Sequence, residues 1–312
     1  MKISFQEIIK FLALKKISYK LIGNLKENYK ICSIFYPEPN GFYFLEEDSL
    51  SLQIKNSIIL TTLEIKTDQS NSLIIIEESP QNIYYKLLDY YYREKPTGII
   101  SETAKIHKKA ILGKNVQIDT FVVLGKCKID DNSIIKSHTV INDNVFIGKN
   151  TIIEPGCIIG ATGMAWIWDE VGERIRQPQL GGVLIEDNCT VGAQSVLVRG
   201  SFNENTNIGE STVIAPGARI GHGTQIGKKV HLANNVILAG NTNIGERSFL
   251  GSGCIISSNI KLPKNTIVGA GALVNKNFKE EDLTLIGVPA KVLLTKNHEQ
   301  KSKGVPTPFK NK

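Results

Sequence analysis

The sequence has 312 residues, of which 41% are hydrophobic and 21% are charged, and its formal net charge at pH 7 is +7. This composition indicates a soluble globular protein of one large or two ordinary domains. The first apolar stretch contains Glu7 and lacks a small-residue cleavage site, and no later stretch is apolar for the roughly eighteen residues that a membrane helix needs. We therefore expect a cytoplasmic protein without a signal peptide or a transmembrane segment.

Nucleic-acid binding is disfavoured, because the basic residues are not interleaved with aromatic ones in a recognisable motif. The five cysteines form no CxxC or Cys/His cluster, and several fall within the repeats described below. We expect them to be buried thiols of a reduced protein.

Residues 1–97 are predicted to form a small α/β domain. Ser4 and Glu7 have the spacing of a capping box ahead of an apolar helix, and Pro80 fits the first position of a second helix. Short runs rich in β-branched and aromatic residues lie between these helices, at residues 30–36, 42–45, 58–61 and 73–76. A linker containing Pro and Gly, residues 95–98, follows the second helix.

Residues 98–278 contain aliphatic residues at intervals of six. A helix repeats near 3.6 residues and a half-buried strand at two, so this period predicts a solenoid of very short strands joined by tight corners. Three hexads, about 18 residues, would make one coil, with equivalent side chains about 4.8 Å apart in successive coils. The second half of the repeat is unbroken: Ile208, Ile214, Ile220, Ile226, Leu232, Leu238, Ile244, Leu250, Ile256, Leu262, Val268 and Val274.

Three irregularities interrupt the repeat, of which the smallest is a five-residue step from Leu124 to Ile129. Residues 161–184 contain no hexad and include both tryptophans, Trp166 and Trp168, while an eleven-residue step separates Leu197 from Ile208. A long insert must leave a solenoid at a corner. Either its aromatic residues pack on a neighbouring coil, or it forms an apolar flap over a substrate groove or a subunit seam. We favour the flap, because the two tryptophans stand together.

One histidine has a spacing that suits catalysis. His222 follows the inward-facing Ile220 by two positions, so it can face outward, and an imidazole can take a proton from an attacking amine or hydroxyl. Gly240 stands eighteen residues later, one coil on, where its backbone N–H could donate to an oxyanion. The spacing predicts a catalytic pair, with a solvated turn as the alternative for His222. Surface or packing roles are expected for His107, His138 and His298.

Residues 279–312 are expected to form a C-terminal extension and a basic tail, which has five lysines from position 296 onward. The tail is either solvated or attracts an acidic partner, such as the phosphates of coenzyme A, a sugar diphosphate or an acyl carrier protein.

Four segments together resemble the UDP-3-O-acylglucosamine N-acyltransferases of lipid A biosynthesis, a group of hexapeptide-repeat acyltransferases. They are the N-terminal α/β module, the junction ESPQNIYYKLLDYYYREKPTGIISETAKIHKKAILGKNVQI, the insert GATGMAWIWDEVGERIRQPQLGG and the hexads RIGHGTQIG. The likeness covers most of residues 40–278. It implies a left-handed β-helix, a homotrimer with active sites between adjacent prisms, and acyl carrier protein as the donor. It also implies that His222 is the base and Gly240 the oxyanion glycine.

The same resemblance implies that Phe44 contacts a uracil, although Glu47 and Leu50 stand where the family has Asn and Tyr. Asn259 occupies the place of a second family histidine, and Ala215 occupies the place of the aspartate near the catalytic histidine.

The group that orients His222 is therefore unassigned, with Glu204, one coil earlier, as a candidate. The segment IGVPAKVL resembles the ending of acetyl-CoA-dependent hexapeptide acetyltransferases, which implies that Gly287, Pro289 and Lys291 bind the acyl donor. The alternative is that this segment closes the last coil.

The sequence thus predicts an N-acyltransferase that moves an acyl group from acyl carrier protein or acyl-CoA to the amine of a nucleotide-linked or lipid-linked amino sugar. An acetyl-CoA-dependent sugar O- or N-acetyltransferase and a non-catalytic sugar-binding β-helix are the alternatives. No bound cofactor or metal is expected, since zinc carbonic anhydrases with this type of prism need three convergent histidines. The residues expected to bind substrate are Phe44, Trp166, Trp168, Asn259 and His231.

Overall fold

The computed structural model describes residues 1–46 and 54–293, which form two compact units, residues 1–94 and a second unit that begins at residue 95. Glu47, Leu50, His298 and the lysines of the basic tail lie outside the described residues. Among the residues described, no helix is long and apolar enough to cross a membrane.

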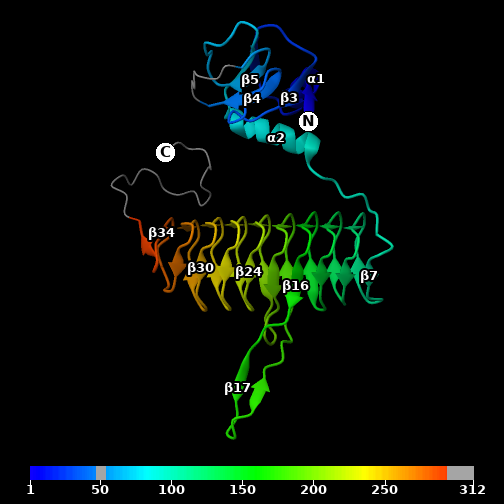
Figure 1. Ribbon diagram of the computed structural model, residues 1–312, viewed down its shortest axis with the longest axis vertical. Helices are drawn as coiled ribbons and strands as arrows, with labels where there is room; N and C mark the ends of the chain where they lie inside the picture. Colours follow the sequence, from blue (N-terminus) through cyan, green and yellow to red (C-terminus); the bar gives the residue numbers. More distant parts are fainter. Residues whose placement is uncertain (47–53, 294–312) are drawn as a thin grey trace. The chain divides into compact units, whose positions relative to one another are not determined.

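The first unit is a six-stranded sheet with two helices (Figure 1). The strand order is β1-β3-β4-β5-β6-β2, with β3 to β6 parallel and the two outer strands antiparallel to their neighbours. The elements are β1 (Lys2–Ser4), α1 (Phe5–Leu14), β2 (Tyr19–Ile22), β3 (Asn28–Ile31), β4 (Gly41–Leu45), β5 (Ile58–Thr61), β6 (Ser72–Ile76) and α2 (Pro80–Tyr92).

Both helices begin at the residues that the sequence indicates. Ser4 and Glu7 form a complete capping box, and Ser79 accepts a hydrogen bond from the N–H of Asn82 with Pro80 as the first helical residue. Apolar residues of both helices pack with alternate residues of the strands, such as Phe42, into one buried cluster. The helices therefore cover one face of this sheet.

The second unit is a parallel β-helix whose strands form three sheets. The nine-stranded sheet contains β7 (Lys105–Ile106), β10 (Val123–Leu124), β13 (Val140–Ile141), β16 (Ile158–Ala161), β21 (Val196–Val198), β24 (Arg219–Ile220), β27 (Ile237–Leu238), β30 (Ile255–Ile256) and β33 (Leu273–Val274). The eight-stranded sheet contains β8 (Ile111–Leu112), β11 (Lys128–Ile129), β14 (Val145–Ile147), β19 (Val183–Ile185), β22 (Thr206–Ile208), β25 (Gln225–Ile226), β28 (Asn243–Ile244) and β31 (Lys261–Leu262).

The ten-stranded sheet contains β9 (Gln117–Ile118), β12 (Ile134–Ile135), β15 (Ile152–Ile153), β20 (Thr190–Val191), β23 (Val213–Ile214), β26 (His231–Leu232), β29 (Phe249–Leu250), β32 (Ile267–Val268), β34 (Thr284–Ile286) and β35 (Lys291–Val292). The chain visits the three sheets in turn, and all their strands are parallel except the last pair. The predicted mainly β architecture, a parallel β-helix after a small α/β domain, is confirmed.

The core of the β-helix is the column of aliphatic residues that the period of six predicts. Ile220 pairs in register with Leu238 in the next coil, and both side chains are buried. Burying one such side chain stabilises the fold by roughly 1.5–3 kcal/mol before the ordering entropy is subtracted. Buried Thr, Ser, Ala and Cys fill the corners, where Thr224 and Thr242 have hydroxyl oxygens 3.2 Å apart.

Cysteines are part of this core. Cys127, Cys157, Cys189 and Cys254 are buried and free, and Cys32 of the first unit is free and partly buried. Burial raises the pKa of Cys127, Cys157 and Cys189 to about 11 and the pKa of Cys254 to about 12. These four thiols stay protonated at neutral pH and are unreactive packing residues.

The insert forms an antiparallel hairpin of β17 (Trp166–Trp168) and β18 (Arg174–Arg176) that extends away from the coils (Figure 1). Trp166 is 49% exposed and Trp168 is 65% exposed. The interpretation that these aromatic residues pack on a neighbouring coil is therefore wrong, because the two strands pair with each other instead. The hairpin also does not lie over the coils of its own chain, so a flap would have to act on another molecule.

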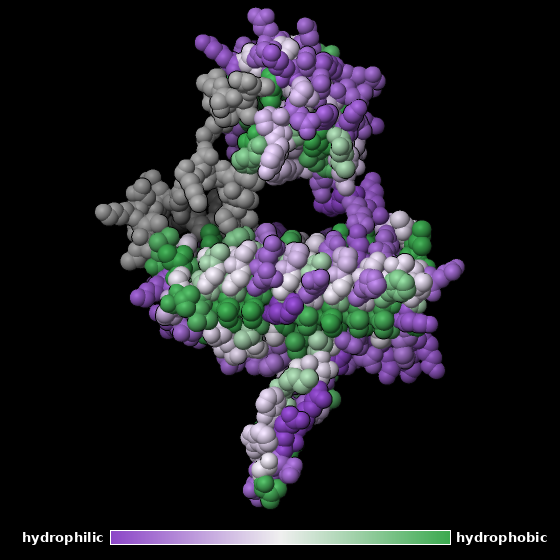
Figure 2. Space-filling model, in the orientation of Figure 1, coloured by the Kyte–Doolittle hydropathy of each residue, from purple (hydrophilic) through white to green (hydrophobic). Residues whose placement is uncertain are grey.

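The visible face of the β-helix carries a band of apolar residues (Figure 2). In the nine-stranded sheet the outward residue of several strands is aliphatic and exposed: Val123, Ile158, Ile237 and Ile255. The charged Arg219 of β24 interrupts this row, and the apolar surface on either side of it is typical of an interaction face.

The column of buried aliphatic residues can be tested on two adjacent residues of β28. Ile244 faces the core and is 1% exposed, whereas Asn243 faces outward. We expect Ile244→Ala to lower the free energy of unfolding by about 2–5 kcal/mol, because it leaves a cavity in the column. Asn243→Ala should change it by no more than about 0.5 kcal/mol. Urea unfolding followed by circular dichroism measures both, and equal losses would contradict the assignment of the core face.

Candidate active site

The hairpin insert, the eleven-residue step, His222 and Gly240 all lie at one corner of the β-helix. We call it the first corner, defined as the connections that lead from the nine-stranded to the eight-stranded sheet. After residue 160 five successive coils contribute to it, and both longer departures from the six-residue period in this part of the chain lie here. In chain order the connections are the hairpin insert between β16 and β19, the loop 199–205, and residues 221–224, 239–242 and 257–260.

His222 and Gly240 stack at this corner in successive coils. The carbonyl oxygen of His222 accepts a hydrogen bond of 2.7 Å from the N–H of Asn241, and the Gly240 carbonyl accepts one of 3.0 Å from Asn259. A Cβ atom on Gly240 would collide with His222 Nε2, so only glycine leaves room for the imidazole in this position. The Gly240 N–H has no acceptor among the described residues.

The loop 199–205 holds the other nitrogen of the imidazole. The eleven-residue step between Leu197 and Ile208 adds five residues to one hexad, and these extra residues form the loop. The Ser201 hydroxyl oxygen lies 3.2 Å from His222 Nδ1, and Ser201 is only 6% exposed. The structure therefore supplies a hydrogen-bond partner for the histidine that sequence reasoning missed.

Glu204 supports this loop from within. One of its carboxylate oxygens accepts the N–H of Ser201 at 2.6 Å, and the other accepts the N–H of Phe202 at 3.0 Å. Burial acts to raise the pKa of Glu204, but backbone hydrogen bonds, including those from Phe202 and Ser201, and attraction to His222 outweigh it and lower the pKa. Glu204 thus positions Ser201 and places a negative charge near the imidazole, while its hydrogen bonds go to backbone N–H groups.

The base of the hairpin insert is hydrogen-bonded to the same loop. The N–H of Leu180 donates to the Ser201 carbonyl at 2.8 Å, and the N–H of Gly181 donates to the Gly200 carbonyl at 3.1 Å. A Cβ on Gly200 would collide with the carbonyl of Glu204, so glycine is required for this close packing. Gln179 is 8% exposed, and its Nε2 lies 3.5 Å from Ser201 Oγ.

Other residues expected to bind substrate lie elsewhere. His231 is on the ten-stranded sheet, with its ring centroid 5.2 Å from that of Phe249, and burial lowers its pKa. Trp166 and Trp168 are on the hairpin, away from its base. Phe44 belongs to the first unit, where its ring packs 5.1 Å from that of Tyr84. Of this group, only Asn259 shares the first corner with His222, and the binding roles of all five stay predictions.

The segment that resembles an acetyl-CoA-dependent ending closes the last coil. Strand β34 continues the ten-stranded sheet, β35 folds back on it, and Leu285 and Ala290 are buried under them. Gly287 and Pro289 lie in the turn and Lys291 begins β35. Their predicted contact with an acyl donor stays a prediction.

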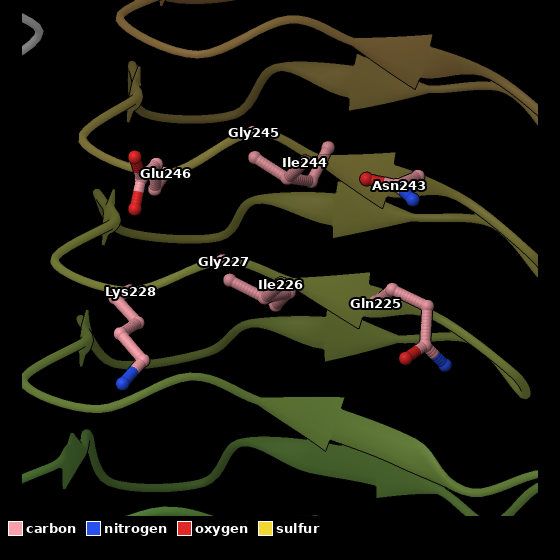
Figure 3. Close-up of a pocket in the computed structure, with 8 residues that line it drawn as sticks. All are labelled: Gln225, Ile226, Gly227, Lys228, Asn243, Ile244, Gly245 and Glu246. Atoms are coloured by element: carbon pink, nitrogen blue, oxygen red, sulfur yellow. The ribbon is translucent and has the colours of Figure 1, made fainter.

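A shallow depression of about 340 Å³ lies on the eight-stranded sheet and the corner that follows it (Figure 3). Equivalent residues of two coils line it, with Gln225 and Asn243 at one end and Lys228 and Glu246 at the other. It contains neither His222 nor Gly240. No three His, Cys, Asp or Glu side chains come together as metal ligands within residues 1–46 and 54–293.

Comparison with known proteins identifies the repeat. A model described as "Bacterial transferase hexapeptide (six repeats)" matches residues 109–143 and 205–240. A second, described as "Hexapeptide repeat of succinyl-transferase", matches residues 138–162, 182–200 and 241–276. Together these matches extend over most of the β-helix and include His222 and Gly240.

Individual relatives match smaller parts. A UDP-3-O-acylglucosamine N-acyltransferase from Coxiella burnetii is 36% identical over 69 residues, which are 20% of this chain and 20% of that protein. The match therefore spans about a fifth of the length of the curated relative.

Solved structures agree on the fold. The UDP-N-acetylglucosamine acyltransferase of Francisella novicida has a TM-score of 0.56 and 25% identity, covering 62% of this chain and 70% of that one. The enzyme of that name from Bacteroides fragilis has a TM-score of 0.57 and 22% identity, covering 62% and 74%.

The support that Glu204 gives to the loop should depend on pH. Because the folded-state pKa of Glu204 is lowered from 4.5, its carboxylate stabilises the fold above that pH and loses the effect as the pH falls through the folded value. We expect Glu204→Gln to lower the melting temperature at pH 7, with a difference from the wild type that shrinks below pH 4.5. Thermal unfolding across this range measures it, and a constant difference would contradict the role of the charge.

Proposed function

Because the chain belongs to the hexapeptide-repeat family of bacterial transferases, we propose that it is an acyltransferase with its active site at the first corner. The stacking of His222 on Gly240 carries the proposal. It places a group that can accept a proton beside a free N–H that can stabilise an oxyanion, with no side chain between them.

The proposed reaction transfers an acyl group from a pantetheine thioester to the amine of a sugar. His222 Nε2 takes a proton as the amine nitrogen attacks the thioester carbonyl, and the carbonyl oxygen becomes an oxyanion that accepts the Gly240 N–H. The tetrahedral intermediate then expels the thiolate, which takes the proton back from the imidazolium. The products are an amide and a free thiol, so no metal or redox step is required.

The proposed acceptor is a nucleotide-linked or lipid-linked amino sugar. This rests on the partial match to a UDP-3-O-acylglucosamine N-acyltransferase and on the likeness to an enzyme that acts on UDP-N-acetylglucosamine. In this proposal Phe44, Trp166, Trp168, Asn259 and His231 contribute to substrate binding. The donor is acyl carrier protein or acyl-CoA, and the protein works in the cytoplasm.

A homotrimer is also part of the proposal. The exposed aliphatic residues of the nine-stranded sheet offer an apolar face that a second copy could cover. In such an assembly the exposed hairpin with Trp166 and Trp168 would reach a neighbouring subunit and act there as the predicted flap.

An acetyl-CoA-dependent sugar acetyltransferase is the second candidate. The observation in its favour is the turn with Gly287, Pro289 and Lys291 at the end of the β-helix, which resembles the ending of such enzymes. Incubation with acetyl-CoA and with a long-chain acyl carrier protein distinguishes the two, according to which thioester is consumed.

Replacement of the base is the first test. We expect His222→Ala to lower turnover by about two to four orders of magnitude while the melting temperature stays close to that of the wild type. The assay measures thiol release from both donors with a panel of nucleotide amino sugars. Near-normal turnover in the variant would reject His222 as the base, and the absence of any acceptor-dependent thiol release in the wild type would favour a non-catalytic sugar-binding protein.

The oxyanion residue can be tested by adding one methyl group. Gly240→Ala should abolish most of the activity, because the new Cβ displaces the His222 ring from its position over residue 240. Ser258 occupies the equivalent place one coil later, already carries a side chain and is exposed, so Ser258→Ala is the matched control. Equal activities of the two variants would contradict the proposed geometry.

A further inference from the structure

Three polar side chains from three successive coils form a row behind the proposed base. His222 Nδ1 is 3.2 Å from Ser201 Oγ, and Ser201 Oγ is 3.5 Å from Gln179 Nε2. Ser201 and Gln179 are both more than nine-tenths buried. Buried polar groups of this kind are normally fully hydrogen-bonded, so the direction of each hydrogen bond in the row has a consequence for its neighbour.

A base at Nε2 requires one particular tautomer of His222. The neutral imidazole carries a single proton, and Nε2 can accept a proton only when that single proton is on Nδ1. The Nδ1–H group must then donate to Ser201 Oγ. As a result the proton of the Ser201 hydroxyl cannot point at the imidazole and needs an acceptor of its own.

Gln179 can be that acceptor. Its Oε1 is buried and has no hydrogen-bond partner, which is unfavourable for a buried acceptor. Rotation of the terminal amide by half a turn exchanges Oε1 and Nε2, so that the oxygen faces Ser201 Oγ. The Ser201 hydroxyl proton then has an acceptor, and the amide nitrogen takes the place that the oxygen held.

We propose that Gln179 and Ser201 are positioning residues that hold His222 in the base-ready tautomer through the chain Nδ1–H to Ser201 Oγ and Ser201 O–H to Gln179 Oε1. This inference rests on the proposed function for its catalytic meaning. A neutral serine and a neutral amide thereby orient the imidazole as a carboxylate could.

The surrounding backbone keeps both residues in place. Two hydrogen bonds join the hairpin base to the loop 199–205, from the N–H groups of Leu180 and Gly181. Gly163 leaves space for the Gln179 amide, since a Cβ there would come within 2.8 Å of the amide atom that points away from Ser201. The base of the hairpin is therefore part of the site within its own chain.

Glu204 has a different task. Its two oxygens accept hydrogen bonds from the N–H groups of Ser201 and Phe202, and only its charge acts on His222. Such an attraction acts on the charge of the ring as a whole, so it does not select between the two neutral tautomers. The choice of tautomer depends on the direction of the Ser201 hydroxyl.

Nitrogen NMR of the full chain labelled with 15N-histidine tests the inference without any assay of activity. The chain has five histidines, and the spectrum of a His222→Gln variant assigns the His222 signals by difference. We expect the neutral His222 of the wild type to be protonated on Nδ1. In Gln179→Met the acceptor is lost at similar volume, so Ser201 should donate to Nδ1 and the proton should move to Nε2.

Two further variants sharpen the result. Gln179→Glu keeps an acceptor oxygen and should retain the Nδ1–H tautomer, and Gln177→Met makes the same chemical change two residues away and should leave it unaltered. A wild-type His222 protonated on Nε2 would overturn the inference, as would an unchanged tautomer in Gln179→Met. Thermal unfolding checks that each variant is folded.

Kinetics supply the second readout once acyl transfer has been observed. We expect Gln179→Met and Ser201→Ala each to lower kcat by on the order of tenfold with little change in KM, and the double variant to lose no more than the single ones. Additive losses would contradict a single chain of hydrogen bonds. The predicted tautomer in a protein that transfers no acyl group would reject the proposed function and leave the hydrogen-bond chain intact.

Discussion

The fold depends on one constraint, the stacking of an aliphatic side chain on its counterpart eighteen residues later. Each strand has only two to four residues, so no coil could be stable alone, and the continuous column of buried Ile, Leu and Val residues is shared by all of them. Extra residues cannot enter this column. They have to leave at a corner, where the backbone is already turning and where a longer loop does not change the register of the next strand.

The chain makes two such departures after residue 160, and both are at the first corner in adjacent coils. The hairpin insert and the loop 199–205 hydrogen-bond to each other and place the buried side chains of Gln179 and Ser201 next to His222. In the coils that follow, the corner returns to its shortest form, which leaves Gly240 beside the imidazole. The proposed site therefore lies where irregular loops meet regular coils. The loops supply the hydrogen bond to His222 Nδ1, and the regular coils supply the Gly240 backbone next to Nε2.

The sequence predicted the features that follow the six-residue repeat and missed those that depend on the conformation of irregular loops. The period of six predicts the coils and the buried column. Because three hexads make one coil, the spacing of eighteen residues predicts that Gly240 lies one coil from His222. The eighteen-residue spacing did not identify the partner of His222, because Ser201 and Gln179 belong to two irregular loops that do not follow the repeat. Glu204 was found as a candidate by counting eighteen residues back, but its carboxylate binds backbone N–H groups instead of the imidazole. The sequence also could not show that Trp166 and Trp168 are exposed, because an extended hairpin and an insert that packs on the coils can have the same amino-acid composition.

The central claim is that the first corner is the place where a thioester carbonyl is attacked. The most direct measurement is a crystal structure of the protein with an unreactive analogue of the acyl donor, in which a methylene group replaces the thioester sulfur of a pantetheine conjugate. The account predicts the carbonyl oxygen within about 3 Å of the Gly240 nitrogen, with His222 Nε2 on the side from which an amine would approach. An analogue bound with its carbonyl elsewhere, for example in the depression between Lys228 and Glu246, would contradict it.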